Sequence, residues 1–150
     1  MNEGKVLTFV NKRVNMKLVR IACKRWDILA VMDQRDRCQV LDFLDGRSPA
    51  QRLFLRFLRT RLPVEGPPAH NADLCKPLGE GIFEFRRQPK GPKLRVLFFY
   101  DGGFRIVCTN AFRKAERTPG AEVELARGLR ERYFRAKLLG RLRIEEIEDE

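Results

Sequence analysis

The sequence predicts an α+β fold in which helices pack on one antiparallel sheet, with the elements in the order β-α-α-β-β-β-α. The main observation is a stretch at residues 76–119, where three apolar-rich runs are separated by two turn signals, as in an antiparallel meander. Helical patterns flank this stretch. One begins with a capping box at Ser48, and another is expected to begin at Thr118 and Pro119.

A strand and two helices are expected before the meander. Apolar side chains alternate over residues 26–32, which predicts a strand, and residues 38–44 have apolar positions at helical spacing. The helix that follows the capping box at Ser48 is expected to end near Leu62, because Pro63 cannot continue a regular helix.

The period of two within the meander predicts which side chains share a face. Residues 83–86 alternate between apolar and charged side chains, so Glu84 and Arg86 lie on the same face. Residues 94–100 are apolar on both faces, as in a central strand, except for Arg95. An arginine at that position needs a partner or a path to solvent, and Glu84 on the neighbouring strand is the candidate partner.

At 150 residues the chain is long enough for one domain with a hydrophobic core. We expect an extension of uncertain structure at residues 1–22, the domain at residues 23–140 with its last helix ending near Leu139, and a disordered acidic tail at residues 141–150. No apolar run approaches the length of a membrane span, and the N-terminus has no apolar signal segment. The expected location is therefore the cytoplasm.

The charge of the chain predicts a polyanionic partner. The last seven residues hold five acids and no base, so residues 1–143 carry 31 basic and 15 acidic residues. Such an excess favours nucleic acid as a partner over a basic surface that only aids solubility. Basic side chains recur along the meander at Arg86, Arg95, Arg105, Arg113 and Lys114.

Several segments, in their order and spacing, resemble the RelE/HigB group of bacterial toxins, and in particular its phage-derived, HigB-like branch. The resemblance covers roughly residues 26–136. Its pieces are KPLGEGIFEFR at residues 76–86, RVLFFY at 95–100, FRK at 112–114, RTP at 117–119 and EVELA at 122–126, with weaker support from VLDFL at 40–44.

The resemblance implies a RelE-like fold and the function of a toxin in a type II toxin–antitoxin system. Such a toxin is an mRNA endoribonuclease that usually acts on the translating ribosome, and a helix-turn-helix antitoxin encoded beside it neutralises it. The implied partners are therefore mRNA, the ribosome and this antitoxin, with no membrane. The resemblance does not imply an oligomeric state.

The resemblance matches five basic residues of this chain to functional positions of the family. Arg86 ends a strand where the family has a basic residue, and Arg95 matches the arginine that opens the central strand. Arg113 and Lys114 fill a paired basic position, and Lys76 matches the lysine before Pro-Leu. These five are the implied catalytic residues. The expected RNA-binding residues are Arg86, Arg87, Arg105 and Arg117.

Departures from the family pattern concern proton transfer. Phe83 stands where relatives often have tyrosine, and no tyrosine lies near Gly120, where some RelE-type enzymes have a catalytic one. Positions 113 and 117 hold arginine in place of lysine, which keeps the positive charge but cannot act as a base. The identity of the second proton-transfer group stays open.

Cleavage of RNA without a metal requires a base for the attacking 2′-hydroxyl, an acid for the leaving 5′-oxygen and cations for the phosphorane. With one histidine, and four cysteines that have no metal-ligand spacing, we expect no metal or other cofactor. A lysine can serve as the base only if burial and neighbouring cations lower its pKa. We assign proton transfer to Lys114, with Lys76 in reserve. Phosphate binding is assigned to Arg86, Arg95 and Arg113.

Two other functions stay open on the sequence alone. A gyrase-poisoning, ParE-like toxin shares this fold without a complete set of nuclease residues. A non-catalytic RNA- or DNA-binding protein would use the same arginines only as phosphate contacts.

Overall fold

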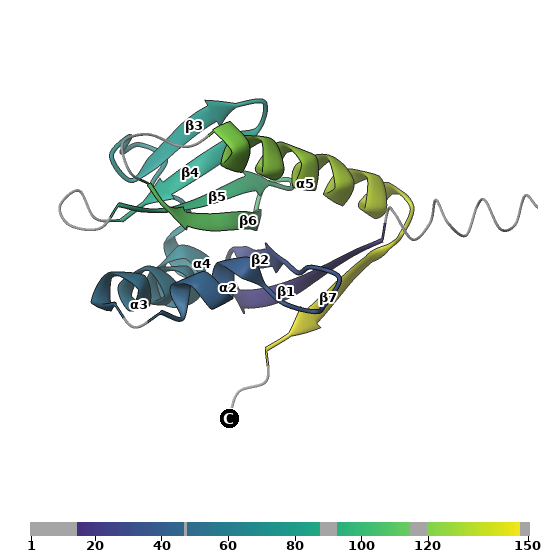
Figure 1. The fold of residues 1–150 in the computed structure, drawn as a ribbon, viewed down its shortest axis with the longest axis horizontal. Helices are drawn as coiled ribbons and strands as arrows, with labels where there is room; N and C mark the ends of the chain where they lie inside the picture. Colours follow the sequence, from purple (N-terminus) through teal and green to yellow (C-terminus); the bar gives the residue numbers. More distant parts are fainter. Residues whose placement is uncertain (1–14, 47, 88–92, 115–119, 148–150) are drawn as a thin grey trace, which may run out of the picture.

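A seven-stranded sheet runs through the protein, with helices on both of its faces (Figure 1). The computed structural model of the protein describes residues 15–46, 48–87, 93–114 and 120–147. The strands are β1 (Met16–Cys23), β2 (Asp27–Val31), β3 (Cys75–Gly79), β4 (Ile82–Arg86), β5 (Leu94–Tyr100), β6 (Arg105–Arg113) and β7 (Leu142–Glu146). Their order in the sheet is β3-β4-β5-β6-β2-β1-β7, and neighbours are antiparallel except for the parallel pairs β2–β6 and β1–β7.

The helices are divided between the two faces. They are α2 (Gln39–Leu44), α3 (Pro49–Arg56), the π-helical turn η1 (Phe57–Arg61), α4 (Leu62–Glu65) and α5 (Gly120–Leu138). The elements from α2 to α4 cover one face, called the α3 face below, and α5 covers the other, called the α5 face (Figure 1). The α+β class predicted from the sequence is confirmed. The prediction of a wholly antiparallel sheet is wrong, because β2 pairs with β6 and β1 pairs with β7 in parallel. Within the described ranges, no helix combines the length and the apolar character needed to span a membrane.

Each face of the sheet has its own hydrophobic core. On the α3 face, the rings of Phe85 and Phe98 stack with centroids 3.9 Å apart, and Phe57 of η1 packs edge-on against Phe85 at 5.5 Å. On the α5 face, Tyr133 is buried and its ring centroid lies 5.2 Å from that of Phe99. β5 supplies apolar side chains to both cores and pairs with a strand on either side. The prediction of a central strand is therefore confirmed.

The local signals for helices are confirmed where the structure describes them. Ser48 caps α3, because its Oγ accepts a hydrogen bond from the Gln51 backbone N–H at 3.1 Å and the Gln51 side chain accepts one from the Ser48 N–H at 3.4 Å. α2 and α5 match two of the predicted helices closely. The cap expected at Thr118 and Pro119 lies outside the described residues.

The helix that begins at α3 continues to Glu65, so the prediction that Pro63 ends it is wrong. Pro63 has no N–H to donate, and in a regular α-helix its ring would clash with the carbonyl four residues earlier. The chain avoids this clash by widening into η1, where the Leu62 N–H donates to the Phe57 carbonyl five residues back. The Pro63 carbonyl then accepts a hydrogen bond from the Trp26 N–H at 2.8 Å, which ties the helix to the sheet.

The structure contains three strands beyond the predicted set. β1 lies mostly in the segment expected to be an extension of uncertain structure, and β3 forms a hairpin with β4, so the meander has four strands in place of three. β7 occupies residues 142–146, where a disordered tail is expected from the sequence, so that prediction is wrong for these residues.

The place of β7 and of β3 in the sheet explains why these two strands form. β7 lies parallel to β1, where Arg20 pairs with Glu146 of β7 and with Asp27 of β2, the latter at 2.8 Å. The ion pair between Arg20 and Glu146 stabilises the acidic strand β7 beside β1. β3 contains Pro77 and Gly79, which are unfavourable inside a sheet. They are tolerated because β3 is at the edge of the sheet, where one side of the strand has no ladder to complete.

Replacing Gly66 with alanine should destabilise the protein for two reasons. Gly66 follows α4 with φ of +77°, and a β-carbon there would lie 2.5 Å from Nε1 of Trp26. Strained backbone and the clash with a rigid ring should together cost about 2–4 kcal/mol of unfolding free energy. Gly102→Ala is the matched control, since Gly102 has φ of +72° but nothing within 4 Å of the added β-carbon. Urea unfolding should show the smaller loss for the control. Equal losses would mean that Trp26 moves aside at no cost.

Candidate active site

Four basic side chains and one acid meet at one end of the sheet, on its α5 face. Strand pairing places them, because Lys76 lies opposite Glu84 and Arg86 lies opposite Arg95. Residues directly opposite in an antiparallel pair present their side chains on the same face. Lys114 joins them from the position just after β6. We call these five residues, which are Lys76, Glu84, Arg86, Arg95 and Lys114, the basic cluster.

Glu84 is the centre of the basic cluster. Its side chain is fully buried, with 0% exposed, and its Oε1 accepts a hydrogen bond from Arg86 Nε at 2.6 Å. Arg95 Nε lies 3.4 Å from the same oxygen. One carboxylate therefore offsets two arginines that would otherwise repel each other directly across β4 and β5. The predicted ion pair between Arg95 and Glu84 is confirmed.

Arg95 is a fixed charge beneath the surface of the cluster. It is 6% exposed, and its Nη1 donates to the Leu94 carbonyl at 2.9 Å. Burial lowers the pKa of Arg95, the carboxylate of Glu84 acts against this, and the charge of Arg86 adds to it. By contrast, 22% of the Arg86 side chain is exposed, and Lys76 is exposed. Arg86, Lys76 and the partly exposed Lys114 are therefore the members that can contact a ligand directly.

The surroundings of Lys114 lower its pKa, which is the direction that a lysine base requires. Its backbone N–H donates to the Lys93 carbonyl at 2.7 Å, which holds it beside the start of β5. Burial lowers the pKa of Lys114, nearby Arg86, Arg95 and Lys76 lower it further, and the carboxylate of the cluster opposes them. A lowered pKa increases the neutral fraction at physiological pH, and the neutral amine is the form that accepts a proton.

Arg113, which the sequence analysis pairs with Lys114, lies on the other face of the sheet. It is opposite Leu94, whose side chain is in the core of the α3 face, and it is exposed. A β-bulge explains this placement, because Thr109 is an extra residue in β6 relative to β5. The extra residue reverses the alternation of side chains over the end of β6. Lys114 therefore faces the cluster and Arg113 does not.

The expected RNA-binding arginines lie in different parts of the structure. Arg86 belongs to the basic cluster, whereas Arg87 turns to the α3 face, where its guanidinium carbon lies 4.1 Å from the centre of the Phe57 ring. Arg105 is at the opposite end of β6 from Lys114. Arg117 lies outside the described residues. The structure therefore brings one of the three described arginines into the cluster.

Arg105 is part of a polar network that holds α5 to the far end of the sheet. Its Nε lies 3.0 Å from Oδ2 of Asp27, and its Nη1 donates to the Tyr133 hydroxyl at 3.2 Å. The Tyr133 hydroxyl donates to Asp101 at 2.5 Å, and Lys137 donates to the same carboxylate at 2.7 Å. Burial raises the pKa of Tyr133 to about 12, and the bond to Asp101 adds to this effect. These contacts give Arg105 a structural role.

The chain has two tyrosines, and neither is in the basic cluster. Tyr133 belongs to the network at the far end of the sheet. Tyr100 packs on the α3 face, where its ring lies edge-on to Phe83 with centroids 5.0 Å apart, and burial raises the pKa of Tyr100 to about 12. Within the described residues, the groups of the cluster that can transfer a proton are therefore the two lysines and Glu84.

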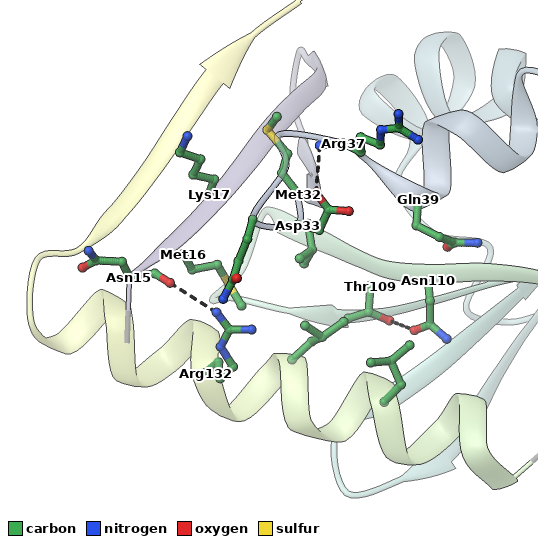
Figure 2. Close-up of a pocket in the computed structure, with 14 residues that line it drawn as sticks. Asn15, Met16, Lys17, Met32, Asp33, Arg37, Gln39, Thr109, Asn110 and Arg132 are labelled. Carbon is green, nitrogen blue, oxygen red and sulfur yellow. Dashed lines mark hydrogen bonds between the residues drawn. The ribbon is translucent and has the colours of Figure 1, made fainter. Parts of the chain in front are cut away.

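A cavity of about 440 Å³ lies between α5, the sheet and the loop after β2 (Figure 2). Polar groups on its wall already bond to protein atoms. The Thr109 hydroxyl donates to Asn110 Oδ1 at 2.6 Å, and the Gln39 side chain donates to and accepts from the Ala111 backbone. None of the five cluster residues lines this cavity. The cavity is therefore separate from the basic cluster.

Glu84 is the residue to which sequence reasoning assigns too small a role. The sequence indicates it only as the partner of Arg95, whereas the structure makes it the partner of Arg86 as well. The sequence does contain a signal for this second partner. Glu84 is the one acid of β4, and it lies on the same face as Ile82 and Arg86. Buried carboxylates usually have charged or hydrogen-bonding partners, so this position predicts a pair of cations around it.

Residues 42–131 match the family described as phage-derived protein Gp49-like (DUF891). The match covers more than half of the chain, so the protein belongs to this family. The family is RelE/toxin-like, and its description as phage-derived agrees with the branch that the sequence resembles. The matched residues include the whole basic cluster. No curated protein matches the chain.

Proposed function

We propose that this protein is the HigB-type toxin of a type II toxin–antitoxin system, and that it is a metal-independent endoribonuclease of ribosome-bound mRNA in the cytoplasm. The observation that carries this proposal is the basic cluster, in which Lys114, with its lowered pKa, lies beside cations held by the buried Glu84. Membership in a toxin-like family and the strong excess of basic residues support it.

Each of the four cations of the cluster has a role in the proposed reaction. Neutral Lys114 accepts the proton of the 2′-hydroxyl, whose oxygen then attacks the adjacent phosphorus. Arg86 binds the non-bridging oxygens, and Arg95 stabilises the developing negative charge from below. Lys76, as an ammonium group, donates a proton to the 5′-oxygen as the bond from phosphorus to that oxygen breaks. The products are a 2′,3′-cyclic phosphate and a 5′-hydroxyl.

The ribosome and an antitoxin complete the proposal. Lysines are weak catalysts compared with a histidine pair, so part of the rate must come from correct alignment of the RNA. A ribosome that holds the message in line for attack would supply that alignment. A helix-turn-helix antitoxin encoded beside the toxin would keep the protein inactive until the antitoxin is lost.

The proposal is tested by producing the protein without an antitoxin in cells and mapping RNA 5′ ends across the transcriptome. New ends within translated messages are expected, together with growth arrest. Equal cleavage of translated and untranslated RNA would contradict the dependence on the ribosome. Growth arrest with unchanged RNA and broken DNA would favour a gyrase poison. No arrest and no cleavage would leave a nucleic-acid-binding protein.

The pH dependence of cleavage should report the environment of Lys114. Because the neutral amine is the base, the single-turnover rate should rise with pH and level off above the pKa of Lys114, which burial and neighbouring cations lower from its ordinary value. Arg86→Ala removes one of those cations, so the inflection should move to higher pH in addition to any loss of rate. An inflection at the same pH in both proteins would show that another group titrates.

A further inference from the structure

A second group of cations lies on the α3 face, beside the end of β4. A groove of about 370 Å³ opens there between α3, η1 and Arg87. We call it the arginine groove. Its lining residues are Leu53, Arg56, Phe57, Thr60, Arg61 and Arg87.

The arginine groove combines positive charge with an aromatic floor. The guanidinium of Arg87 lies over the ring of Phe57, with its carbon 4.1 Å from the ring centre. Arg56 and Arg61 are exposed on the rim, and Arg61 is 3.4 Å from the exposed carboxylate of Glu65. A guanidinium stacked on a ring keeps its edge available, and that edge can donate two parallel hydrogen bonds to a phosphate.

The electrostatics of the groove favour an anionic ligand. Burial lowers the pKa of Arg87, and the positive charge of Arg61 lowers it further, whereas Glu65 acts against them. Burial and repulsion of this kind are relieved when an anion neutralises the group. Surface ion pairs such as the one between Arg61 and Glu65 contribute little, so a phosphate can compete with that carboxylate.

The arginine groove is joined to the active face through two consecutive residues. Arg86, the last residue of β4, points to the α5 face and belongs to the basic cluster, while Arg87 follows it and points to the α3 face. Both side chains therefore leave the backbone at the same end of the sheet. A single polyanionic strand that passes this end can contact the cluster with one phosphate and the groove with another.

We propose that the arginine groove is a second phosphate-binding site, which holds backbone phosphates of RNA outside the linkage that is cleaved. This inference rests on the proposed function for the identity of the polyanion. The groove takes no part in bond breaking. It fixes the path of the strand around the end of β4 and thereby raises the affinity for RNA that is long enough to contact both faces.

The experiment compares RNA binding by the parent protein and by three variants. Arg87→Ala combined with Arg61→Ala removes two groove cations, and Arg87→Lys keeps the charge but loses the planar fork. Arg59→Ala is the matched control, because Arg59 is an exposed arginine of η1 that does not line the groove. Unfolding midpoints confirm that the variants fold. Binding is measured with Lys114→Ala present in every protein, so that cleavage does not interfere.

The double variant should bind a long oligouridylate roughly tenfold more weakly, and the slope of log affinity against log salt should fall by about 0.7 for each phosphate that the protein no longer neutralises. Arg59→Ala should bind like the parent, and Arg87→Lys should be intermediate. If only overall charge matters, Arg59→Ala should lose half as much log affinity as the double variant, which removes twice the charge, and that result would overturn the proposal. So would unchanged binding to both oligouridylate and ribosomes, or stronger binding of oligoglutamate than of oligouridylate.

Two further comparisons show whether the bound phosphates belong to the message or to ribosomal RNA. They also show whether this proposal or the proposed function has failed. If the phosphates belong to the message, the double variant loses affinity for free oligouridylate; if they belong to ribosomal RNA, it loses co-sedimentation with ribosomes while its affinity for oligouridylate is kept. Loss of neither overturns the inference. If the parent protein cleaves no RNA but the double variant loses more than twice the log affinity that Arg59→Ala loses, the proposed function fails and the groove stands.

Discussion

Lys114→Ala should abolish RNA cleavage, with a loss of about 10²–10⁴ in the single-turnover rate. The amine is the member of the basic cluster whose lowered pKa suits a base, and an alanine has no group that can take the proton. Stability should change little, because the substitution removes one of several cations that repel each other. RNA affinity should fall only modestly, since the remaining arginines still contact phosphates.

Two variants separate proton transfer from charge at this position. Lys114→Arg keeps the positive charge but cannot give up its proton, so it should be nearly as inactive as the alanine variant. Arg113→Ala removes the same charge one residue away, on the opposite face of the sheet, and should retain cleavage. An active Lys114→Arg enzyme would show that the residue acts only as a cation. Inactive Arg113→Ala would place the reaction elsewhere.

Glu84→Gln should cause a large loss of stability, about 3–5 kcal/mol. The substitution keeps the shape of the side chain but leaves the 6%-exposed Arg95 without its carboxylate, and Arg86 then faces Arg95 directly across the sheet. An uncompensated buried charge is much more costly than an absent ion pair. Urea unfolding of the purified protein measures the loss.

The matched control is Glu80→Gln in the turn between β3 and β4. The Glu80 carboxylate pairs with Arg127 at 2.9 Å, but 72% of its side chain is exposed, so its loss should cost less than about 1 kcal/mol. A second variant, Glu84→Gln with Arg95→Met, removes both charges and should recover most of the stability while cleavage stays impaired. If Glu84→Gln is no less stable than Glu80→Gln, the buried carboxylate does not hold the cluster together.

The fold was predictable where neighbouring residues decide the structure. The capping box at Ser48, the alternation in β2 and the apolar run of β5 are local signals, and a helix begins and two strands form where they predict. β3 and β7 were not predictable in this way. β3 contains a proline and a glycine that only its edge position permits, and β7 forms because Arg20 and β1 offer a partner from the distant end of the chain.

The site was predictable in its residue types and less so in its geometry. Four of the five implied catalytic residues, Lys76, Arg86, Arg95 and Lys114, lie together in the structure, and their catalytic roles stay a prediction. Arg113 and Lys114 are consecutive, so they face opposite sides of the sheet, and the bulge at position 109 decides that Lys114 is the one on the side of the cluster. No composition or spacing rule reveals this bulge. The burial of Arg95 likewise comes from tertiary packing. It changes the expected role of Arg95 from direct contact with phosphate to a buried positive charge beneath the surface of the cluster.

The most direct test of the account is the chemistry of the RNA ends that the purified protein produces from a message on the ribosome, with a chelator present. Attack by the 2′-hydroxyl must leave a 2′,3′-cyclic phosphate on one fragment and a 5′-hydroxyl on the other. We expect the protein with Lys114 to produce these ends and the Lys114→Ala variant to produce none. A 5′-phosphate beside a 3′-hydroxyl, or cleavage that stops when the chelator is added, would contradict it.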